Sequence, residues 1–178
     1  PHQVSLRIKI SKKHFCGGSI ISNRFILTAA HCTQGMYANP MYIYAVVGAL
    51  QRLKGGVSVA LDKITPHENY NTKLYFNDIS LLRAAKEIVF NKLVQPIALP
   101  TSNIDGKEEV VLSGWGRNGY PGGQTPNILQ FIKPTTLTVD ECKKRFNGHG
   151  AMQLVDETVI CTTNPIDSGA CQGDSGGP

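Results

Sequence analysis

The 178-residue chain lacks several features that are typical of other protein classes. It contains no run of about 18 apolar residues, so no segment is predicted to cross a membrane. Its five cysteines form no Cys-x-x-Cys pair and no zinc-ligand spacing, which argues against a metal-binding or redox protein. No signal-peptide pattern opens the sequence, and we expect that any targeting segment has been removed or was never recorded in this sequence.

Acidic residues are the minority charge, with 13 Asp and Glu against 18 Lys and Arg and a formal net charge of +5. A basic chain invites comparison with nucleic-acid-binding proteins. However, Arg7, Lys9, Lys12 and Lys13 alternate with apolar residues or lie in a turn, and 143–145 are predicted to share one solvated helix face. Scattered surface charge is therefore favoured over a phosphate-binding patch, and no nucleic-acid partner is expected.

Short runs of alternating apolar and polar residues, separated by Gly, Pro and Asn turns, fill most of the sequence. In residues 3–10, apolar side chains recur at every second position, which is the period of a half-buried strand. One helix is expected, from the capping box Thr138-Val-Asp-Glu141 to Phe146. Further strands are predicted around 15–21, 25–28, 57–61, 79–82, 110–112, 128–133 and 155–161. The pattern indicates an all-β sandwich or barrel.

A polar, turn-rich segment separates the strands into two series. We interpret residues 99–108 as a linker between a first β unit at 1–98 and a second at 109–178, the two together forming one domain. No internal repeat is visible in the sequence, and two similar barrels do not require one.

Three local motifs carry the chemistry, in the order His, Asp, Ser. They are Leu27-Thr-Ala-Ala-His31-Cys32, Asn77-Asp78-Ile-Ser-Leu-Leu82 and Cys171-Gln-Gly-Asp-Ser175-Gly-Gly-Pro178. A serine hydroxyl is a poor nucleophile near neutral pH and requires an adjacent base. An imidazole can take that proton and return it to the leaving group, while a carboxylate orients the ring. His31, Asp78 and Ser175 are therefore the candidate catalytic residues.

Each motif alone has a structural alternative. His31 suits a core histidine between alanines and a cysteine, Asp78 suits a turn, and 173–177 suits a flexible glycine turn. The common order favours catalysis, and further segments at 16–20, 96–100 and 112–116 agree with it: Cys-Gly-Gly-Ser-Ile, Pro-Ile-Ala-Leu-Pro and Leu-Ser-Gly-Trp-Gly. With these residues the chain resembles the chymotrypsin/trypsin family of serine proteases, in its insect or other arthropod form.

The resemblance implies two antiparallel Greek-key β-barrels, the second incomplete, with the site in the cleft between them. It implies a secreted, monomeric serine endopeptidase that hydrolyses peptide bonds through an acyl-enzyme on Ser175 and needs no cofactor. Protein or peptide substrates and protein protease inhibitors are the expected partners. The alternative is a non-catalytic homologue that acts as a binding module.

Several site residues are carried over from the family. The backbone N–H groups of Gly173 and Ser175 are expected to form the oxyanion hole. Asp174 is expected to pair with a new N-terminal amine after zymogen cleavage, although an Ile-Val-Gly-Gly-like start is absent. No metal site is expected, because the segment 48–60 contains no acidic residue for the calcium loop of some relatives.

The specificity pocket rests on few residues. In the family, the sixth residue before the nucleophile forms the pocket base, which here is Gly169, with Ala170 and Gln172 beside it. An uncharged base predicts chymotrypsin-like cleavage after large apolar or aromatic residues, and Asp167 lies two positions away from the trypsin-like place. An elastase-like or collagenolytic preference stays open.

The resemblance also implies two disulfides, Cys16–Cys32 and Cys142–Cys161. It leaves Cys171 to pair with a cysteine beyond residue 178, so we expect the sequence to be a piece of a longer protein. A redox-active or intermolecular thiol is the alternative. The other histidines, at positions 2, 14, 67 and 149, lie in terminal or turn segments and are predicted to be surface residues.

Overall fold

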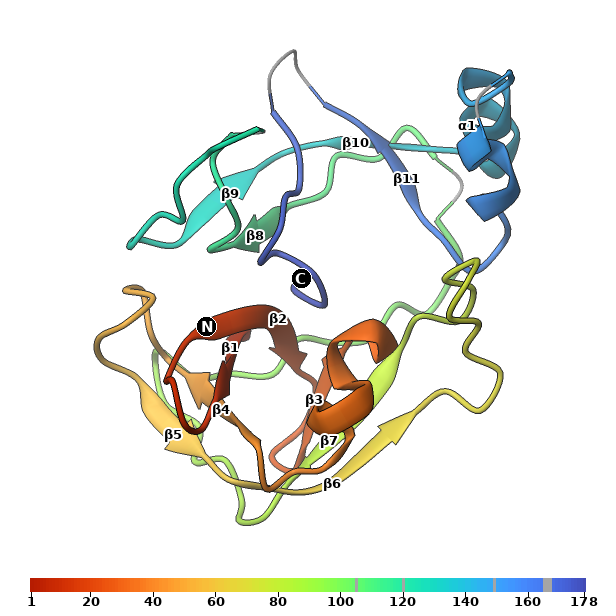
Figure 1. Cartoon of the computed structure of the whole chain (residues 1–178). Coiled ribbons are helices and arrows are strands. Elements are labelled where there is room, and N and C mark those ends of the chain that lie inside the picture. Colours follow the sequence, from red (N-terminus) through yellow and green to blue (C-terminus); the bar gives the residue numbers. More distant parts are fainter. Residues whose placement is uncertain (105, 120, 149, 165–167) are drawn as a thin grey trace.

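The computed structural model describes residues 1–104, 106–119, 121–148, 150–164 and 168–178, and their regular structure is mostly β (Figure 1). Strands before residue 85 form a seven-stranded sheet, and later strands form two sheets of two strands each. The large sheet contains β1 (Gln3–Ile8), β2 (His14–Ile20), β3 (Phe25–Thr28), β4 (Ile43–Val47), β5 (Val57–Val59), β6 (Leu61–Pro66) and β7 (Ser80–Ala84).

The large sheet is antiparallel and strongly curled. Its strand order is β5-β4-β1-β2-β3-β7-β6. Because only Ala60 separates the two edge strands, the sheet curls until its edges meet in one bent strand. The curl encloses a core that includes Val4, Leu6, Ile20 and Leu82, each with an exposed fraction of 0%. Successive side chains along each strand point to opposite faces of the sheet, and those on the inner face form this core.

The later part of the chain has shorter elements. Strands β8 (Leu112–Gly114) and β9 (Gln130–Ile132) pair with each other, as do β10 (Thr135–Leu137) and β11 (Cys161–Thr163). The helix α1 (Val139–Arg145) begins at Thr138 with the predicted capping box. The 3₁₀ helices are η1 (Ala30–Thr33), η2 (Gly35–Ala38) and η3 (Gly150–Leu154). No helix among the described residues has the length and apolarity needed to cross a membrane.

The strand predicted at 155–161 is wrong, because only Cys161 belongs to a strand there. Asp156 explains the difference. Its Oδ1 accepts hydrogen bonds from the backbone N–H and the hydroxyl of Thr158, at 2.8 and 2.7 Å. This local bonding stabilises a turn in place of a ladder. Strands β4 and β10 were not predicted, since neither segment alternates clearly in sequence.

Strand β1 is buried on both faces, whereas its alternation predicted one buried face. Gln3, Ser5 and Arg7 oppose the apolar face and are also buried. The later part of the chain covers them: the Ser113 hydroxyl donates to Gln3 Oε1 at 2.7 Å. Ile10, predicted inside, lies beyond the strand and is 87% exposed. The prediction that Arg7 is a surface charge is therefore wrong.

Candidate active site

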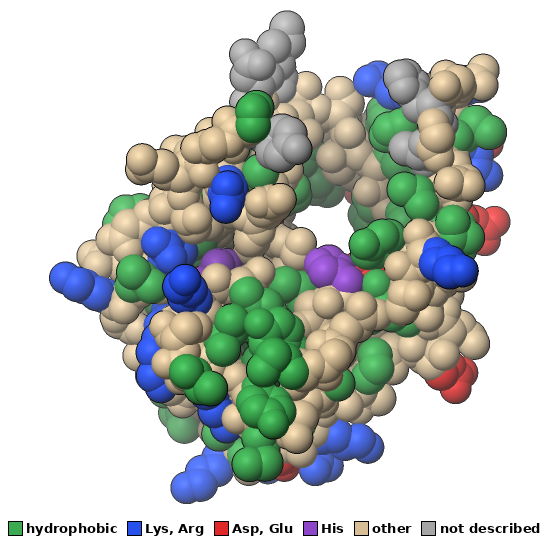
Figure 2. Space-filling model, viewed as in Figure 1, with side chains coloured by type: hydrophobic (Ala, Val, Ile, Leu, Met, Phe, Trp, Pro, Cys, Tyr) green, Lys and Arg blue, Asp and Glu red, His purple; other side chains and the backbone are tan. Residues whose placement is uncertain are grey.

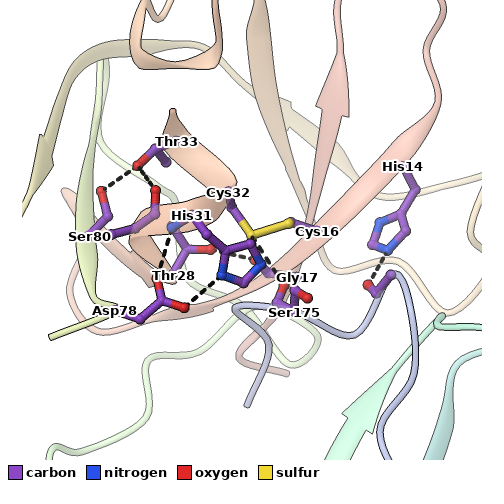
Figure 3. The surroundings of a disulfide bond; sticks show 12 residues. His14, Cys16, Gly17, Thr28, His31, Cys32, Thr33, Asp78, Ser80 and Ser175 are labelled. Atoms are coloured by element: carbon purple, nitrogen blue, oxygen red, sulfur yellow. Dashed lines mark hydrogen bonds and ion pairs between the residues drawn. A yellow bond between two sulfur atoms is a disulfide. The ribbon is translucent and has the colours of Figure 1, made fainter. Parts of the chain in front are cut away.

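His31 and Asp78 form a two-point contact. His31 lies on η1, and its Nδ1 is 2.6 Å from Asp78 Oδ2 (Figure 3). The backbone N–H of His31 donates to the other carboxylate oxygen at 2.8 Å. Asp78 therefore fixes both the ring and the main chain of His31. The His31 side chain remains 33% exposed, so the ring is accessible to a ligand.

Three further contacts hold η1 in place. A disulfide joins Cys32 to Cys16 on β2. A hydrogen bond of 3.1 Å joins the hydroxyls of Thr33 and Ser80, the first residue of β7. The Thr33 hydroxyl also donates to the Ala30 carbonyl at 3.0 Å. The short helix is thus attached to strands on both of its sides, which limits the movement of His31.

Ser175 lies in a turn that packs on β2. The Gly17 N–H donates to the Ser175 carbonyl at 2.8 Å. The same carbonyl oxygen and the His31 Nε2 are each 3.7 Å from the Cys32 sulfur (Figure 3). Ser175 and His31 therefore lie next to the same sulfur atom. Within the described parts of the chain, no hydrogen bond joins the Ser175 hydroxyl to His31. Figure 2 shows a hollow in this face of the molecule with a histidine side chain at its edge.

Glycine gives the turn its shape. Gly173 has φ +106° and Gly176 has φ +75°, which side chains with a Cβ rarely adopt. A Cβ on Gly176 would also collide with the Thr28 hydroxyl. In the described segments, the N–H groups of Gly173 and Ser175 donate to no other group. Both are therefore free to bind an acceptor.

The carboxylate of Asp174 is held by backbone donors. It accepts from the Gly116 N–H at 2.7 Å and from the Cys171 N–H at 3.0 Å. A Cβ on Gly114 or Gly116 would collide with this carboxylate, so two glycines of the 112–116 segment make room for it. The side chain ties the turn to the segment that follows β8.

His14 is the residue that the sequence patterns did not reveal. It is half-buried, its Nε2 is 2.8 Å from the Gly173 carbonyl oxygen, and its Nδ1 is 2.8 Å from the Ser5 hydroxyl. Its ring packs edge-on against Trp115 at 5.5 Å. The surface prediction is therefore wrong for His14. His67 is exposed as predicted, and His149 lies outside the described residues. His14 is the first residue of β2, the strand that docks Ser175 through Gly17. Without coordinates, this position in the sequence indicates only weakly that His14 belongs to the site.

Two tyrosines flank the His31–Asp78 pair. The Tyr75 ring lies edge-on to the His31 ring at 6.1 Å. The Tyr70 hydroxyl is buried and has no hydrogen-bond partner among the described residues. Burial, and secondarily the negative charge of Asp78, raise the pKa of Tyr70, so its phenol stays neutral beside the pair.

The structure places two of the three predicted pocket residues in the lining of a cavity and the third outside it. Gly169 and Ala170 line a cavity of about 650 Å³, together with Asp174 and Arg117. Gln172 is not among the lining residues, and its carbonyl accepts from the Arg117 N–H at 3.0 Å. Asp167 lies outside the described residues.

The predicted disulfide pairs are both present. The second, Cys142–Cys161, joins α1 to β11, and Cys171 is a free, half-buried thiol. Ligand atoms of Cys16, Cys32 and His31 lie within 4.8 Å of one another, which is close enough to bind a metal ion. Both sulfurs are bonded to each other, however, and neither can act as a thiolate ligand.

Sequence comparison identifies the family. The family model described as Trypsin matches residues 1–178. The chain belongs to the trypsin family. Among trypsin-family proteins, chymotrypsin-2 of Vespa crabro is 41% identical to it over 179 residues, covering 100% of this chain and 76% of the wasp protein. A serine protease of Anopheles gambiae is 37% identical, with coverage of 100% and 62%. The chain thus spans roughly two thirds to three quarters of the length of these relatives.

The fold is also found in a solved structure. The scabies mite inactivated protease paralogue S-D1 superposes with a TM-score of 0.90 at 24% identity, covering 100% of this chain and 75% of that one. This match establishes a trypsin-like fold.

Proposed function

We propose that the protein is a secreted serine endopeptidase in which His31, Asp78 and Ser175 form the catalytic triad. One observation carries the proposal: Asp78 holds His31 at two points while the turn of Ser175 docks on β2 beside the same ring. Disulfides are typical of oxidising, extracellular compartments, which supports secretion.

The reaction follows from these positions. The Ser175 Oγ forms a bond to the scissile carbonyl carbon, and its proton passes to His31 Nε2. The Gly173 and Ser175 N–H groups stabilise the oxyanion, and loss of one such donor typically costs about 10²–10³ in rate. His31 then gives the proton to the leaving amine as the C–N bond breaks. Water hydrolyses the acyl-enzyme by the same steps in reverse.

Asp78 supports His31 throughout this cycle. Its carboxylate keeps the Nδ1 proton on the ring, so that Nε2 is free to accept, and it stabilises the imidazolium. In the family's triad, replacing this carboxylate by an amide lowers turnover by about 10⁴. Asp174 has a separate role, as partner of the N-terminal amine that zymogen cleavage creates. Its place on the wall of the cavity makes it reachable by an ammonium group.

The substrate preference that we propose is chymotrypsin-like, for large apolar or aromatic side chains. Gly169 and Ala170 supply uncharged lining at the pocket base. Gln172 lies outside the cavity lining, and its carbonyl accepts from the N–H of Arg117, which does line the cavity. Protein inhibitors are proposed as further partners of a monomeric enzyme, without cofactor or metal.

The proposed architecture is a pair of Greek-key barrels. The curled sheet corresponds to the first, within 1–98, and the two small sheets belong to an incomplete second, within 109–178, after a linker at 99–108. This arrangement supplies His31 and Asp78 from one side of the cleft and Ser175 from the other.

A non-catalytic binding module is the second candidate. The mite protein of the same fold is called an inactivated protease paralogue, so the fold alone does not require activity. This chain has all three triad residue types at the motifs of the family. Their presence favours the enzyme.

Labelling with a fluorophosphonate distinguishes the two candidates. The full-length, activated protein is treated with the reagent, and the modified residue is mapped by mass spectrometry. We expect label on Ser175, and none in the His31→Ala variant, because the hydroxyl then lacks its base. An unlabelled but folded and activated protein would favour the binding module. Peptides that differ before the scissile bond test the pocket, and cleavage after Arg or Lys would overturn the Gly169 argument.

A further inference from the structure

The segment that carries Asp78 has a constrained backbone. It lies between β6 and β7, and Asn77, directly before Asp78, has φ +56°. Residues with a Cβ rarely adopt this left-handed conformation, and asparagine is among the few that tolerate it. The Ile79 N–H donates to the Asn77 carbonyl at 2.8 Å, so Asp78 is the central residue of a three-residue turn. The direction of the Asp78 side chain therefore depends on the conformation of Asn77.

Asn77 is held by hydrogen bonds on two sides. Its side-chain Nδ2 donates to the Asn69 carbonyl at 3.2 Å, within the same segment. Its backbone N–H donates to the Thr158 hydroxyl oxygen, also at 3.2 Å. Thr158 lies 81 positions later in the sequence, in the turn that leads into β11 (Figure 1). The later part of the chain thus contacts the residue next to Asp78.

The Thr158 hydroxyl is oriented by Asp156. The Asp156 Oδ1 accepts from the backbone N–H and from the hydroxyl of Thr158, at 2.8 and 2.7 Å. A hydroxyl has one proton, and because this proton goes to Asp156, the lone pairs of the oxygen are available to the Asn77 N–H. Hydrogen bonds in such a chain polarise one another, so the carboxylate makes the hydroxyl a better acceptor. The three residues form one directed chain, from Asn77 through Thr158 to Asp156.

The tip of the same segment is ordered by its own hydrogen bonds. The Asn71 Oδ1 accepts from the N–H groups of Lys73 and Leu74, at 2.9 and 3.0 Å. The Asn71 carbonyl accepts from the Tyr75 N–H at 2.7 Å. These bonds connect residues of the tip with one another and do not include Asn77. Asn77 is therefore the joint between the tip and Asp78, and Thr158 holds this joint.

We propose that Asp156 and Thr158 position the Asp78 carboxylate by holding Asn77 in its left-handed conformation. Thr158 is then a positioning residue, because it acts through Asn77. The inference rests on the proposed function, in which the Asp78 carboxylate orients His31. It adds a turn from the later part of the chain that none of the three triad motifs contains.

The physical reason is that a left-handed conformation costs free energy and persists only where the surrounding bonds favour it. Without the Thr158 hydroxyl, the Asn77 backbone relaxes, and the three-residue turn at Asp78 moves with it. Both contacts of Asp78 with His31, at 2.6 and 2.8 Å, depend on that turn. Asn77 is only half-buried, so water can replace the lost acceptor. The expected effect is therefore that of one ordinary hydrogen bond and smaller than the loss of Asp78 itself.

Proton NMR tests this geometry without any activity. In the full-length, activated Ser175→Ala variant, the resonance of the His31 Nδ1–H proton reports the strength of its hydrogen bond to Asp78. Thr158→Val keeps the shape of the side chain but removes the hydroxyl. We expect the resonance to move upfield and the proton to exchange faster with water. Thr65→Val makes the same change at an exposed threonine of β6 and is the matched control. The same resonance in both variants would overturn the proposal.

Kinetics test the positioning role in the active enzyme. Thr158→Val is expected to lower kcat by about 2- to 10-fold, the range of one ordinary hydrogen bond, with KM almost unchanged. Thr158→Ser keeps the hydroxyl and should recover most of the loss, and Thr65→Val should match the parent. Asp156→Ala releases the hydroxyl and should also lower kcat, so a parent-like value would remove Asp156 from the proposal. Equal losses in Thr158→Val and Thr158→Ser would contradict it altogether.

The two tests separate this proposal from the proposed function. If the parent protein is not labelled by fluorophosphonate, the enzyme assignment fails, while the His31 resonance still decides whether Thr158 positions Asp78. If the parent is active and Thr158→Val matches it in both tests, the positioning role is wrong and the triad stands. If Thr158→Val lowers kcat but leaves the His31 resonance unchanged, the loss does not arise at Asp78, and the proposal is overturned as well.

Discussion

The part of the chain before residue 98 and the part after residue 109 hold the candidate site in different ways. The first part buries a continuous apolar cluster inside one curled sheet, and His31 is fixed by contacts within that part. The later part has two small sheets, and the turn of Ser175 is joined to β2 by the hydrogen bonds from Gly17 N–H to the Ser175 carbonyl and between His14 and the Gly173 carbonyl. His31 is thus positioned by its own sheet, whereas Ser175 depends on docking between the two parts.

The largest expected effect breaks the contact inside the first part. Asp78→Asn should lower kcat by about 10⁴, because the amide no longer stabilises the imidazolium or its correct tautomer. The comparison is made by steady-state hydrolysis of a peptide substrate. Asp62→Asn is the control, since Asp62 pairs with Arg24 and Arg83 away from His31. A loss below tenfold in Asp78→Asn would mean that His31 is not held as the base.

A core substitution tests how much of the fold rests on the curled sheet. Leu82 has an exposed fraction of 0%, and Leu82→Ala should lower the free energy of unfolding by about 2–5 kcal/mol. Its neighbour Leu81 is 37% exposed, and Leu81→Ala should change the free energy by about 0.5 kcal/mol or less. Denaturant unfolding of both variants measures the difference. Equal destabilisation would show that burial inside the sheet is not the main source of its stability.

The two disulfides allow the earlier and later parts of the chain to be compared directly, because the bonds close loops of similar length. The sequence separations are 16 residues for Cys16–Cys32 and 19 for Cys142–Cys161. By chain entropy, each should contribute about 3 kcal/mol. Alanine at both members of either pair should therefore destabilise the protein similarly. Activity should fall further without Cys16–Cys32, since that bond holds η1 and His31. Equal loss of activity at equal stability would contradict this view.

The smallest expected effect lies in the later part. Thr138→Ala removes the side-chain acceptor for the Glu141 N–H and should cost about 1 kcal/mol of stability. Thr138→Ser keeps the hydroxyl and should retain most of it. Activity of Thr138→Ala, measured well below its unfolding midpoint, should match the parent. Among the described residues, α1 shares no hydrogen bond, ion pair or disulfide with His31, Asp78 or Ser175. A selective loss of activity would mean that α1 supports the docking of Ser175.

Local signals explain which elements could be predicted. The capping box at Thr138 satisfies its own helix terminus, and alternation marks β1, β2 and β3, so neighbouring residues determine these elements. The strand expected at 155–161 failed because a single carboxylate, Asp156, redirects the backbone. Whether a side chain takes the place of strand-to-strand hydrogen bonds depends on local geometry. The alternation of apolar and polar residues in the sequence does not reveal that geometry.

The sequence by itself determined the motifs of His31, Asp78 and Ser175 and the mostly β structure, because each depends on residue type and short spacing. The family resemblance that these motifs carry implied the disulfide partners. Only the tertiary structure decided that β1 is buried on both faces and that Arg7 and His14 lie behind Gly173. The reason is physical. A polar strand face is buried only when hydrogen-bond partners are supplied to it. Gln3 finds its partner at Ser113, 110 positions away, and His14 finds one at Gly173, 159 positions away.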